Sequence, residues 1–208
     1  MLENYKKLNN GVIKQISIEN QIQKYDVEYI TSRYNSYGVV GTYMSYLRLG
    51  ALVGVIGNNI KSILDVGYGN GDFLKLCNDI VPNCYGSDIT NYPLPSGIKF
   101  IDDITSKYFE VVCFFDSLEH FESISFVKDL KCKYIYISVP WCHYLSDDWF
   151  ETWKHRRPDE HLWHFDDIGL NNFFVENGYK KIYQSNLEDI IRKPKDNLNN
   201  ILTCIFVK

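Results

Sequence analysis

Three glycines at alternate positions form the strongest chemical signal in this sequence. Residues 63–66 are β-prone and apolar apart from Asp65, and Gly67, Gly69 and Gly71 follow them. A helix is expected from Asp72 onward. Glycine allows a tight turn and lets the backbone come close to a ligand. Free N–H groups in the first turn of a helix bind carboxylate or phosphate groups. The pattern therefore indicates a ligand at this strand-to-helix turn, with a tight turn that binds nothing as the alternative.

An acidic residue about 20 residues further on extends the pattern. Asp88 lies in a second β-prone run, residues 84–89, and an acid in this place commonly accepts hydrogen bonds from ribose hydroxyls. A dinucleotide is one candidate for the ligand. Its fingerprint, G-x-G-x-x-G, requires a glycine at position 72, whereas this chain has Asp72. The spacing G-x-G-x-G thus argues against a nicotinamide oxidoreductase.

The elements around this turn alternate between strands and helices. Helical stretches are predicted at 72–78 and 123–130, and β-prone runs occur at 63–66, 84–87, 98–101, 111–115 and 134–139. This alternation predicts an α/β fold whose mostly parallel sheet is covered on both faces. The continuous apolar run at 111–115 is typical of a strand that is buried on both faces.

The two ends of the chain flank this region. Residues 1–60 are predicted to form an N-terminal helical cap or lid, and residues 61–208 the core. The cap holds an apolar segment at 43–56 and a helix whose inner face is formed by Ile18, Ile22, Tyr25 and Tyr29. The core is expected to end with a helix at 166–177, strands at 180–184 and 201–207, and a mobile loop at 192–197 between those strands.

The composition is that of a globular protein of about one domain. The chain has 208 residues, of which 45% are hydrophobic and 23% charged. A net charge of −4 makes a nucleic-acid partner improbable, because nucleic acids usually meet a basic face. No C-x-x-C pair, signal peptide or apolar run long enough for a membrane span is evident. These features predict a cytoplasmic protein with no membrane partner, and they leave its oligomeric state open.

Five segments resemble, in order and approximate spacing, the motifs of class I S-adenosylmethionine-dependent methyltransferases. They are D-V-G-Y-G-N-G at 65–71, G-S-D-I at 86–89, V-V-C-F-F-D-S-L-E-H-F at 111–121, I-S-V-P at 137–140 and E-H-L-W-H-F at 160–165. The resemblance covers about residues 60 to 208. It implies a Rossmann-like three-layer sandwich with an antiparallel last strand and N-terminal helices. It also implies S-adenosylmethionine as the cofactor and S-adenosylhomocysteine as the product.

The same resemblance implies which residues hold the cofactor. The glycine turn would surround its methionine end, Asp88 its ribose, and Phe115 its sulfonium end. The full set is Asp65, Gly67, Tyr68, Gly69, Gly71, Asp88, Ile89, Asp103, Ile104, Phe115, Asp116 and Ser117. Two features depart from the family pattern. Tyr68 replaces a residue that is usually small, and residues 90–97 are too few for the helix of a parallel crossover.

The methyl acceptor is expected beside groups that can take up a proton. Transfer from a sulfonium depends mainly on alignment, and a base helps only when the acceptor is a hydroxyl or a protonated amine. The candidate catalytic residues are Glu119, His120, His161 and His164, and the candidate substrate-binding residues are Tyr34, Tyr37, His143 and Trp163. For each of these the alternative is a purely structural role in a turn or in the core.

A metal site is a further interpretation of this region. His155, Asp159, His161 and His164 carry metal-binding groups, but their spacing matches no familiar metal motif, so no metal is expected.

The leading hypothesis is transfer of a methyl group to a small-molecule or sugar-like acceptor. The alternatives are an RNA or protein acceptor, or a non-catalytic cofactor-binding protein. No N/D-P-P-Y/W run, typical of enzymes that methylate amino groups on DNA bases or glutamine, follows the strand at 111–115.

Overall fold

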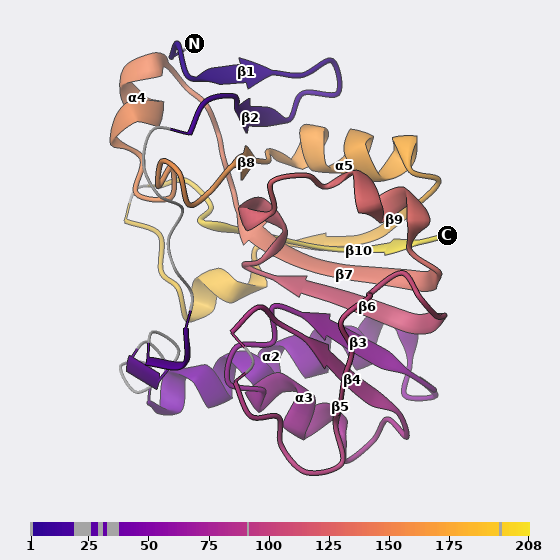
Figure 1. The fold of residues 1–208 in the computed structure, drawn as a ribbon. Coiled ribbons are helices and arrows are strands. Elements are labelled where there is room, and N and C mark those ends of the chain that lie inside the picture. The colour runs from indigo at the N-terminus through magenta and orange to yellow at the C-terminus, as the bar shows by residue number, and fades with distance from the viewer. Residues whose placement is uncertain (1, 19–25, 29–30, 33–37, 91, 196) are drawn as a thin grey trace.

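A seven-stranded sheet forms the centre of the protein (Figure 1). The computed structural model describes residues 2–18, 26–28, 31–32, 38–90, 92–195 and 197–208. In spatial order the strands are β5 (Lys99–Phe100), β4 (Cys84–Ser87), β3 (Ile63–Val66), β6 (Phe109–Phe115), β7 (Cys132–Pro140), β10 (Ile201–Val207) and β9 (Lys180–Ser185). Neighbouring strands from β5 to β7 are parallel, and β10 is antiparallel to both β7 and β9. This is the sheet of the Rossmann-like methyltransferase fold that the sequence predicted.

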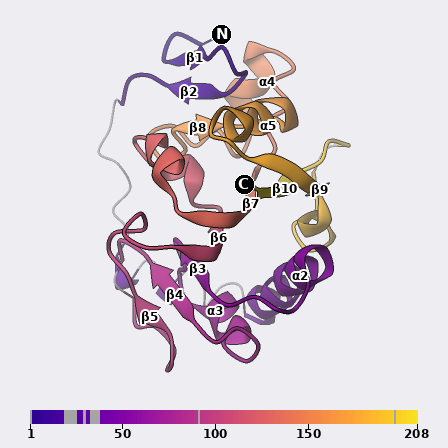
Figure 2. The same ribbon diagram turned by 90° about the vertical axis from the view of Figure 1, so that its right-hand side faces the viewer.

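Helices cover both faces of the sheet and make a three-layer arrangement (Figure 2). On one face lie α2 (Val39–Ile56) and α3 (Asp72–Cys77), and on the other lie α5 (Asp167–Glu176) and the 3-10 helix η2 (Ser125–Asp129). Two more 3-10 helices, η1 (Leu118–His120) and η3 (Leu187–Ile190), follow strands β6 and β9. The predicted helix at 123–130 is thus a short 3-10 helix.

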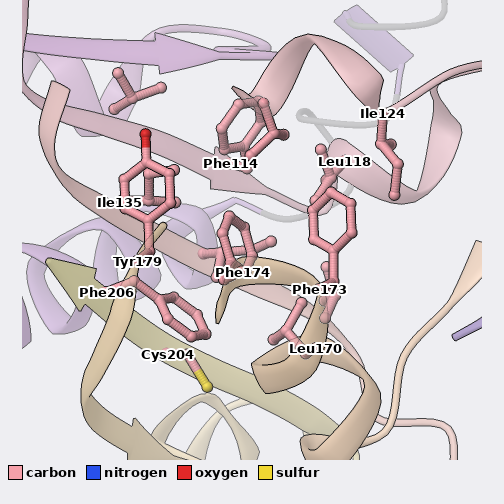
Figure 3. Close-up of a cluster of buried hydrophobic side chains, with 14 of the residues drawn as sticks. Phe114, Leu118, Ile124, Ile135, Leu170, Phe173, Phe174, Tyr179, Cys204 and Phe206 are labelled. Carbon is pink, nitrogen blue, oxygen red and sulfur yellow. The ribbon is translucent and has the colours of Figure 1, made fainter. Parts of the chain in front are cut away.

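Strand β6 packs against the helical layers on both faces of the sheet. Its side chains alternate between the faces: Val112 and Phe114 enter the cluster beneath α5, while Val111, Cys113 and Phe115 enter the cluster beneath α2 and α3. Every one of these five side chains is buried. Figure 3 shows the first cluster, in which Phe174 of α5 stacks on Phe206 of β10 with ring centroids 4.4 Å apart. A strand buried on both faces is what the continuous apolar run predicted.

The N-terminal segment begins with strands. β1 (Tyr5–Lys7) and β2 (Ile13–Gln15) form a hairpin, and β2 pairs with β8 (Trp163–His164) in a second, three-stranded sheet. Tyr5 packs edge-on against Phe150 of α4 (Asp147–Thr152) with ring centroids 5.0 Å apart. Residues 2–15 are therefore attached to the C-terminal half of the chain. Within residues 1–60, α2 is helical as expected; most of the predicted helix around 18–29 lies outside the described residues.

The crossover between β4 and β5 has no helix among the residues that the structure describes there. Tyr68 fills much of the space instead, because its ring lies against Gly86 of β4, and a Cβ at Gly86 would come within 2.7 Å of that ring. Leu94 lies beside it, and the Tyr68 hydroxyl donates a hydrogen bond to the carbonyl of Tyr92. Tyr68 and residues of the short crossover thus cover the sheet where a helix normally lies.

Helix α2 is long and apolar enough to cross a membrane, judged by length and composition alone, so the expectation that the sequence holds no apolar run of that length was wrong. Its Leu52 is fully buried against the sheet, whereas Val39, Tyr43 and Tyr46 are mostly exposed. A helix at the surface of a soluble core can have the same composition.

Candidate active site

A cavity of about 1390 Å³ opens at the carboxyl ends of the parallel strands. In an open parallel sheet these ends converge where the strand order reverses, here between β3 and β6, and ligands bind in the resulting crevice. The lining comes from the turn after β3, the end of β4, residues 102–105, the end of β6, helix α2 and the segment 154–161. Every predicted cofactor-binding residue lines the cavity except Gly71, the last glycine of the turn.

The glycine turn is fixed by its packing as well as by its backbone angles. Gly67, Gly69 and Gly71 have φ angles of 81°, 58° and 78°, a region that side chains disfavour. A Cβ at Gly67 would lie 2.7 Å from the Ser117 Cβ, and a Cβ at Gly71 would lie 2.7 Å from Pro95. The Ser117 hydroxyl also donates to the carbonyl oxygen of Val66 at 2.7 Å. These contacts hold the turn against β6 and leave its backbone facing the cavity.

Asp65 supplies an unsatisfied acceptor at the base of this turn. Its carboxyl is buried, and its Oδ1 has no hydrogen-bond partner in the described structure. Burial raises the pKa of Asp65 to about 7, although Arg48 opposes the shift. Buried carboxylates normally have donors, so a cationic or N–H group of a ligand fits this position. The methionine end of S-adenosylmethionine carries such a group.

Asp88 joins the end of β4 to the glycine turn. Its Oδ2 accepts the N–H of Gly69 at 2.9 Å, and its Oδ1 accepts the N–H and the hydroxyl of Thr90, both at 2.8 Å. A carboxylate offers about four acceptor sites, so about one remains for a ligand hydroxyl. Ile89 beside it is 77% exposed and lines the cavity, which leaves an open apolar surface for a flat ring.

Asp103 and Ile104 also line the cavity. Asp103 is exposed and accepts hydrogen bonds from the N–H and hydroxyl of Thr105, which lower its pKa. Ile104 packs against the core cluster and also lines the cavity. The role of both residues at the adenine edge stays a prediction.

An ion network closes the side of the cavity next to β6. Asp116, with an unusual φ of 51°, accepts two hydrogen bonds from Arg192 at 2.7 Å and one from Arg48 at 3.3 Å. Glu188 is fully buried and binds Arg48 through both carboxylate oxygens, at 2.7 and 3.0 Å. Burial alone would raise the pKa of Asp116, but the two guanidiniums hold it below its usual value. Asp116 is thus oriented by two arginines.

Two of the predicted catalytic histidines meet at the other end of the cavity. His120 and His161 both line it, and their rings form an edge-to-face pair with centroids 4.6 Å apart. Burial, and secondly the nearby His120, lowers the pKa of His161 to about 2. Glu119 lies behind them, almost fully buried, and burial raises its pKa well above the usual value, with Asp116 adding to the effect.

The other predicted acceptor-side residues lie elsewhere. His164 points away from the cavity and packs against Tyr5, Phe150 and Trp153, where burial lowers its pKa to about 3. The remaining two have structural contacts and are not among the lining residues. His143 bonds the carbonyl of Asn199 at 2.8 Å, and the buried Trp163 donates to the carbonyl of Phe121 at 2.6 Å. Tyr34 and Tyr37 lie outside the described residues.

The four residues that were weighed as metal ligands and set aside, His155, Asp159, His161 and His164, do not converge on one point. Asp159 accepts a hydrogen bond from Gln15 beneath the N-terminal hairpin, and His155 contacts Asn200.

Sequence reasoning missed the ion network. Arg48 is the one charged residue in α2, and a lone charge in an apolar helix indicates a buried partner. Arg192 was placed in a mobile loop, but its N–H bonds Glu188 and its carbonyl accepts from Asn200. No local signal in the sequence points to Glu188.

Comparison with known proteins agrees with this geometry. The profile of a family described as "Methyltransferase domain" matches residues 46–184. No curated protein sequence matches closely enough to add to this comparison.

Several solved structures share the fold. A putative S-adenosylmethionine-dependent methyltransferase from Listeria monocytogenes has a TM-score of 0.55 at 16% identity, over 79% of this chain and 99% of the other. A putative methyltransferase in complex with an activator protein, from Haloferax volcanii, has a TM-score of 0.61 at 12% identity, over 89% and 99%. The magnesium protoporphyrin IX methyltransferase from Synechocystis, with S-adenosylhomocysteine bound, has a TM-score of 0.53 at 14% identity, over 89% of each chain.

The family match covers most of the chain, the sheet order is that of the methyltransferase fold, and the buried acceptor of Asp65 fits the cofactor. The chain therefore belongs to the methyltransferase domain family and is an S-adenosylmethionine-dependent methyltransferase.

Proposed function

We propose that this enzyme methylates a small polar molecule that enters the cavity beside His120 and His161. The observation that carries the proposal is the continuity of one cavity from the glycine turn to these two histidines. Its volume of about 1390 Å³ exceeds the roughly 300–1,000 Å³ of an ordinary ligand pocket. The cavity thus has room for both a cofactor and a compact acceptor.

Residues at one end of the cavity would bind the cofactor, and residues at the other end would bind the acceptor. S-adenosylmethionine supplies an activated methyl group on a sulfonium. The glycine turn, Asp65 and Asp88 would bind its methionine and ribose, which fixes the direction in which the methyl group points. His120 and His161 mark the acceptor end, where an acceptor hydroxyl must lose a proton.

Charge at the acceptor end favours an acceptor that carries oxygen atoms. Lys154 and Arg157 line the cavity near His161, together with the acid Glu160. Arg157 is paired with Glu160 at 2.7 Å, so the wall presents a mixed polar surface. Such a wall suits a sugar-like or hydroxylated compound better than an apolar one.

An RNA or protein acceptor is the second candidate. The neighbours differ in this respect, because the Synechocystis protein is named for a small porphyrin, whereas the Haloferax protein is bound to an activator protein. The net charge of −4 favours the small molecule, since a protein surface that binds RNA is usually basic.

The test is methyl transfer from radiolabelled S-adenosylmethionine into fractionated cell extract. We expect label in the small-molecule fraction, and none with the His120→Ala variant, which should still bind the cofactor in a calorimetric titration. Label confined to the RNA or protein fraction would contradict the proposed acceptor class. Normal transfer by His120→Ala would remove that side chain from the acceptor end.

A further inference from the structure

Glu119 is the most unusual polar group in the described part of the chain. Its side chain is 1% exposed, and neither carboxylate oxygen has a hydrogen-bond partner. Leaving a buried carboxylate without donors costs several kcal/mol, so such groups are normally paired or bind a metal. The ion network beside β6 does not satisfy it, because Arg48 and Arg192 bond Asp116 and Glu188 instead.

Two imidazoles lie next to this carboxylate. One nitrogen of His120, one nitrogen of His161 and one oxygen of Glu119 all lie within 4.8 Å of one another. The Nδ1 atom of His120 is 2.9 Å from the carbonyl oxygen of Glu160, and that of His161 is 2.8 Å from the carbonyl oxygen of His155. A carbonyl only accepts, so each Nδ1 carries the proton and each Nε2 keeps its lone pair.

Hydrogen bonds from Nδ1 to a backbone carbonyl, as His120 and His161 have, are typical of metal-binding histidines. A histidine that binds a metal almost always donates its other N–H to a carbonyl or carboxylate, which fixes the ring and its tautomer. The backbone also holds the three residues together, because the N–H of Leu162 donates to the carbonyl of Glu119 at 2.8 Å. The segment around His161 is thereby tied directly to η1.

We propose that Glu119, His120 and His161 form a binding site for one divalent transition-metal ion at the acceptor end of the cavity. Two imidazole nitrogens and one carboxylate oxygen suit Zn²⁺, Co²⁺ or Fe²⁺ better than Mg²⁺ or Ca²⁺, which prefer all-oxygen sites. The sequence had assigned no metal, and it had weighed His161 together with His155, Asp159 and His164. In the structure the side chains of those three residues contact Asn200, Gln15 and Phe150 instead.

The distances require a modest closure when the metal binds. Bonds of about 2.0–2.2 Å in a tetrahedral site place ligand atoms roughly 3.4 Å apart. Ligand atoms at the present upper limit of 4.8 Å must therefore approach one another by about 1.4 Å, which side-chain rotation can supply. Three protein ligands leave at least one position open. Since His120 and His161 line the cavity, a water molecule or an oxygen of the acceptor can occupy it, an extension that rests on the proposed function.

The test measures metal binding itself and needs no knowledge of the acceptor. The full-length protein is stripped with a chelator, titrated with Zn²⁺ by calorimetry, and assayed for metal content after gel filtration. We expect about one Zn²⁺ per chain, retained in the presence of equimolar Mg²⁺, and visible absorption bands when Co²⁺ is used instead. The Glu119→Gln and His161→Gln variants should bind Zn²⁺ at least about 100-fold more weakly.

Two controls separate metal binding from folding and from cofactor binding. Glu176→Gln makes the same chemical change at a solvent-facing carboxylate of α5 and should bind Zn²⁺ as the wild type does. Glu119→Gln keeps the size and shape of the side chain, so the variant should fold and bind S-adenosylmethionine normally. The proposal is overturned if the wild type binds no stoichiometric metal, or if Glu119→Gln binds it equally well. Either result, combined with normal cofactor binding, leaves the proposed methyl transfer intact.

Discussion

Replacing Arg48 by methionine should destabilise the protein more than almost any other single change in α2. Arg48 binds the fully buried Glu188 through two hydrogen bonds, of 2.7 and 3.0 Å, and its own side chain is 14% exposed. Removing one partner of a buried ion pair costs about 3–5 kcal/mol, because the other charge stays behind without compensation. Arg192 still lies 3.3 Å from Glu188 and compensates part of its charge. We therefore expect a loss of folding stability at the lower end of this range, about 3 kcal/mol.

The assay is urea unfolding followed by circular dichroism, with a thermal scan as a second measure. For a chain of this size a loss of 1 kcal/mol lowers the Tm by about 2–4 °C, so we expect a fall of about 6–12 °C. The double variant Arg48→Met with Glu188→Gln removes both charges. It should regain most of the loss, with a coupling energy of about 2 kcal/mol between the two sites.

Two results would refute this reasoning. A cost below about 1 kcal/mol for Arg48→Met would mean that Glu188 is solvated or satisfied by Arg192 alone. A double variant as unstable as the sum of the two single variants would mean that the pair is not coupled. Glu176→Gln, at an exposed carboxylate, serves as the reference for a change without a buried partner.

Three further predictions concern the cofactor end of the cavity. Asp88→Ala should weaken S-adenosylmethionine binding by about 10- to 100-fold, through the loss of charged hydrogen bonds worth about 1.5–3 kcal/mol. Calorimetry measures the affinity, and Asp79→Ala, at an exposed carboxylate that does not line the cavity, is the control. Equal affinities in the two variants would exclude Asp88 as a ligand. Cofactor binding should release a proton, because the pKa of Asp65 is raised to about 7 in the free protein and a bound cation stabilises the carboxylate. The affinity for S-adenosylmethionine should therefore rise from pH 6 to pH 8. Calorimetric titrations in two buffers of different ionisation enthalpy measure the proton release, and they would show none if Asp65 does not face the ligand. Gly67→Ala should lower the free energy of unfolding by about 1–3 kcal/mol more than Gly178→Ala does. Both glycines have positive φ angles, of 81° and 84°, but only at Gly67 would a Cβ collide with a neighbour. Equal free energies of unfolding in the two variants would contradict the collision.

Much of the fold follows from local pattern. The apolar run of β6, the glycine turn before α3 and the Asp166 cap of α5 each express a preference of a few neighbouring residues. The helix of α5 was predicted within one residue at each end, because its cap accepts the N–H of Gly169 at 2.5 Å and Gly178 follows its last turn. The N-terminal hairpin was not predicted, because β1 and β2 have three residues each and are stabilised by pairing with β8, about 150 residues away.

The cofactor end of the cavity could be predicted from local sequence patterns, whereas the acceptor end depends on long-range contacts. The sequence alone determined the glycine turn, Asp65 and Asp88, because they lie at strand ends in a parallel sheet and such ends must share one edge. Only the tertiary structure decided that His161 faces the cavity while His164 faces the hydrophobic cluster beneath the hairpin. It also brought Glu119 to His161, and Arg48 to Glu188 across 140 residues. Long-range pairs of this kind depend on how α2, η1 and η3 pack against the sheet, and no local preference encodes that packing.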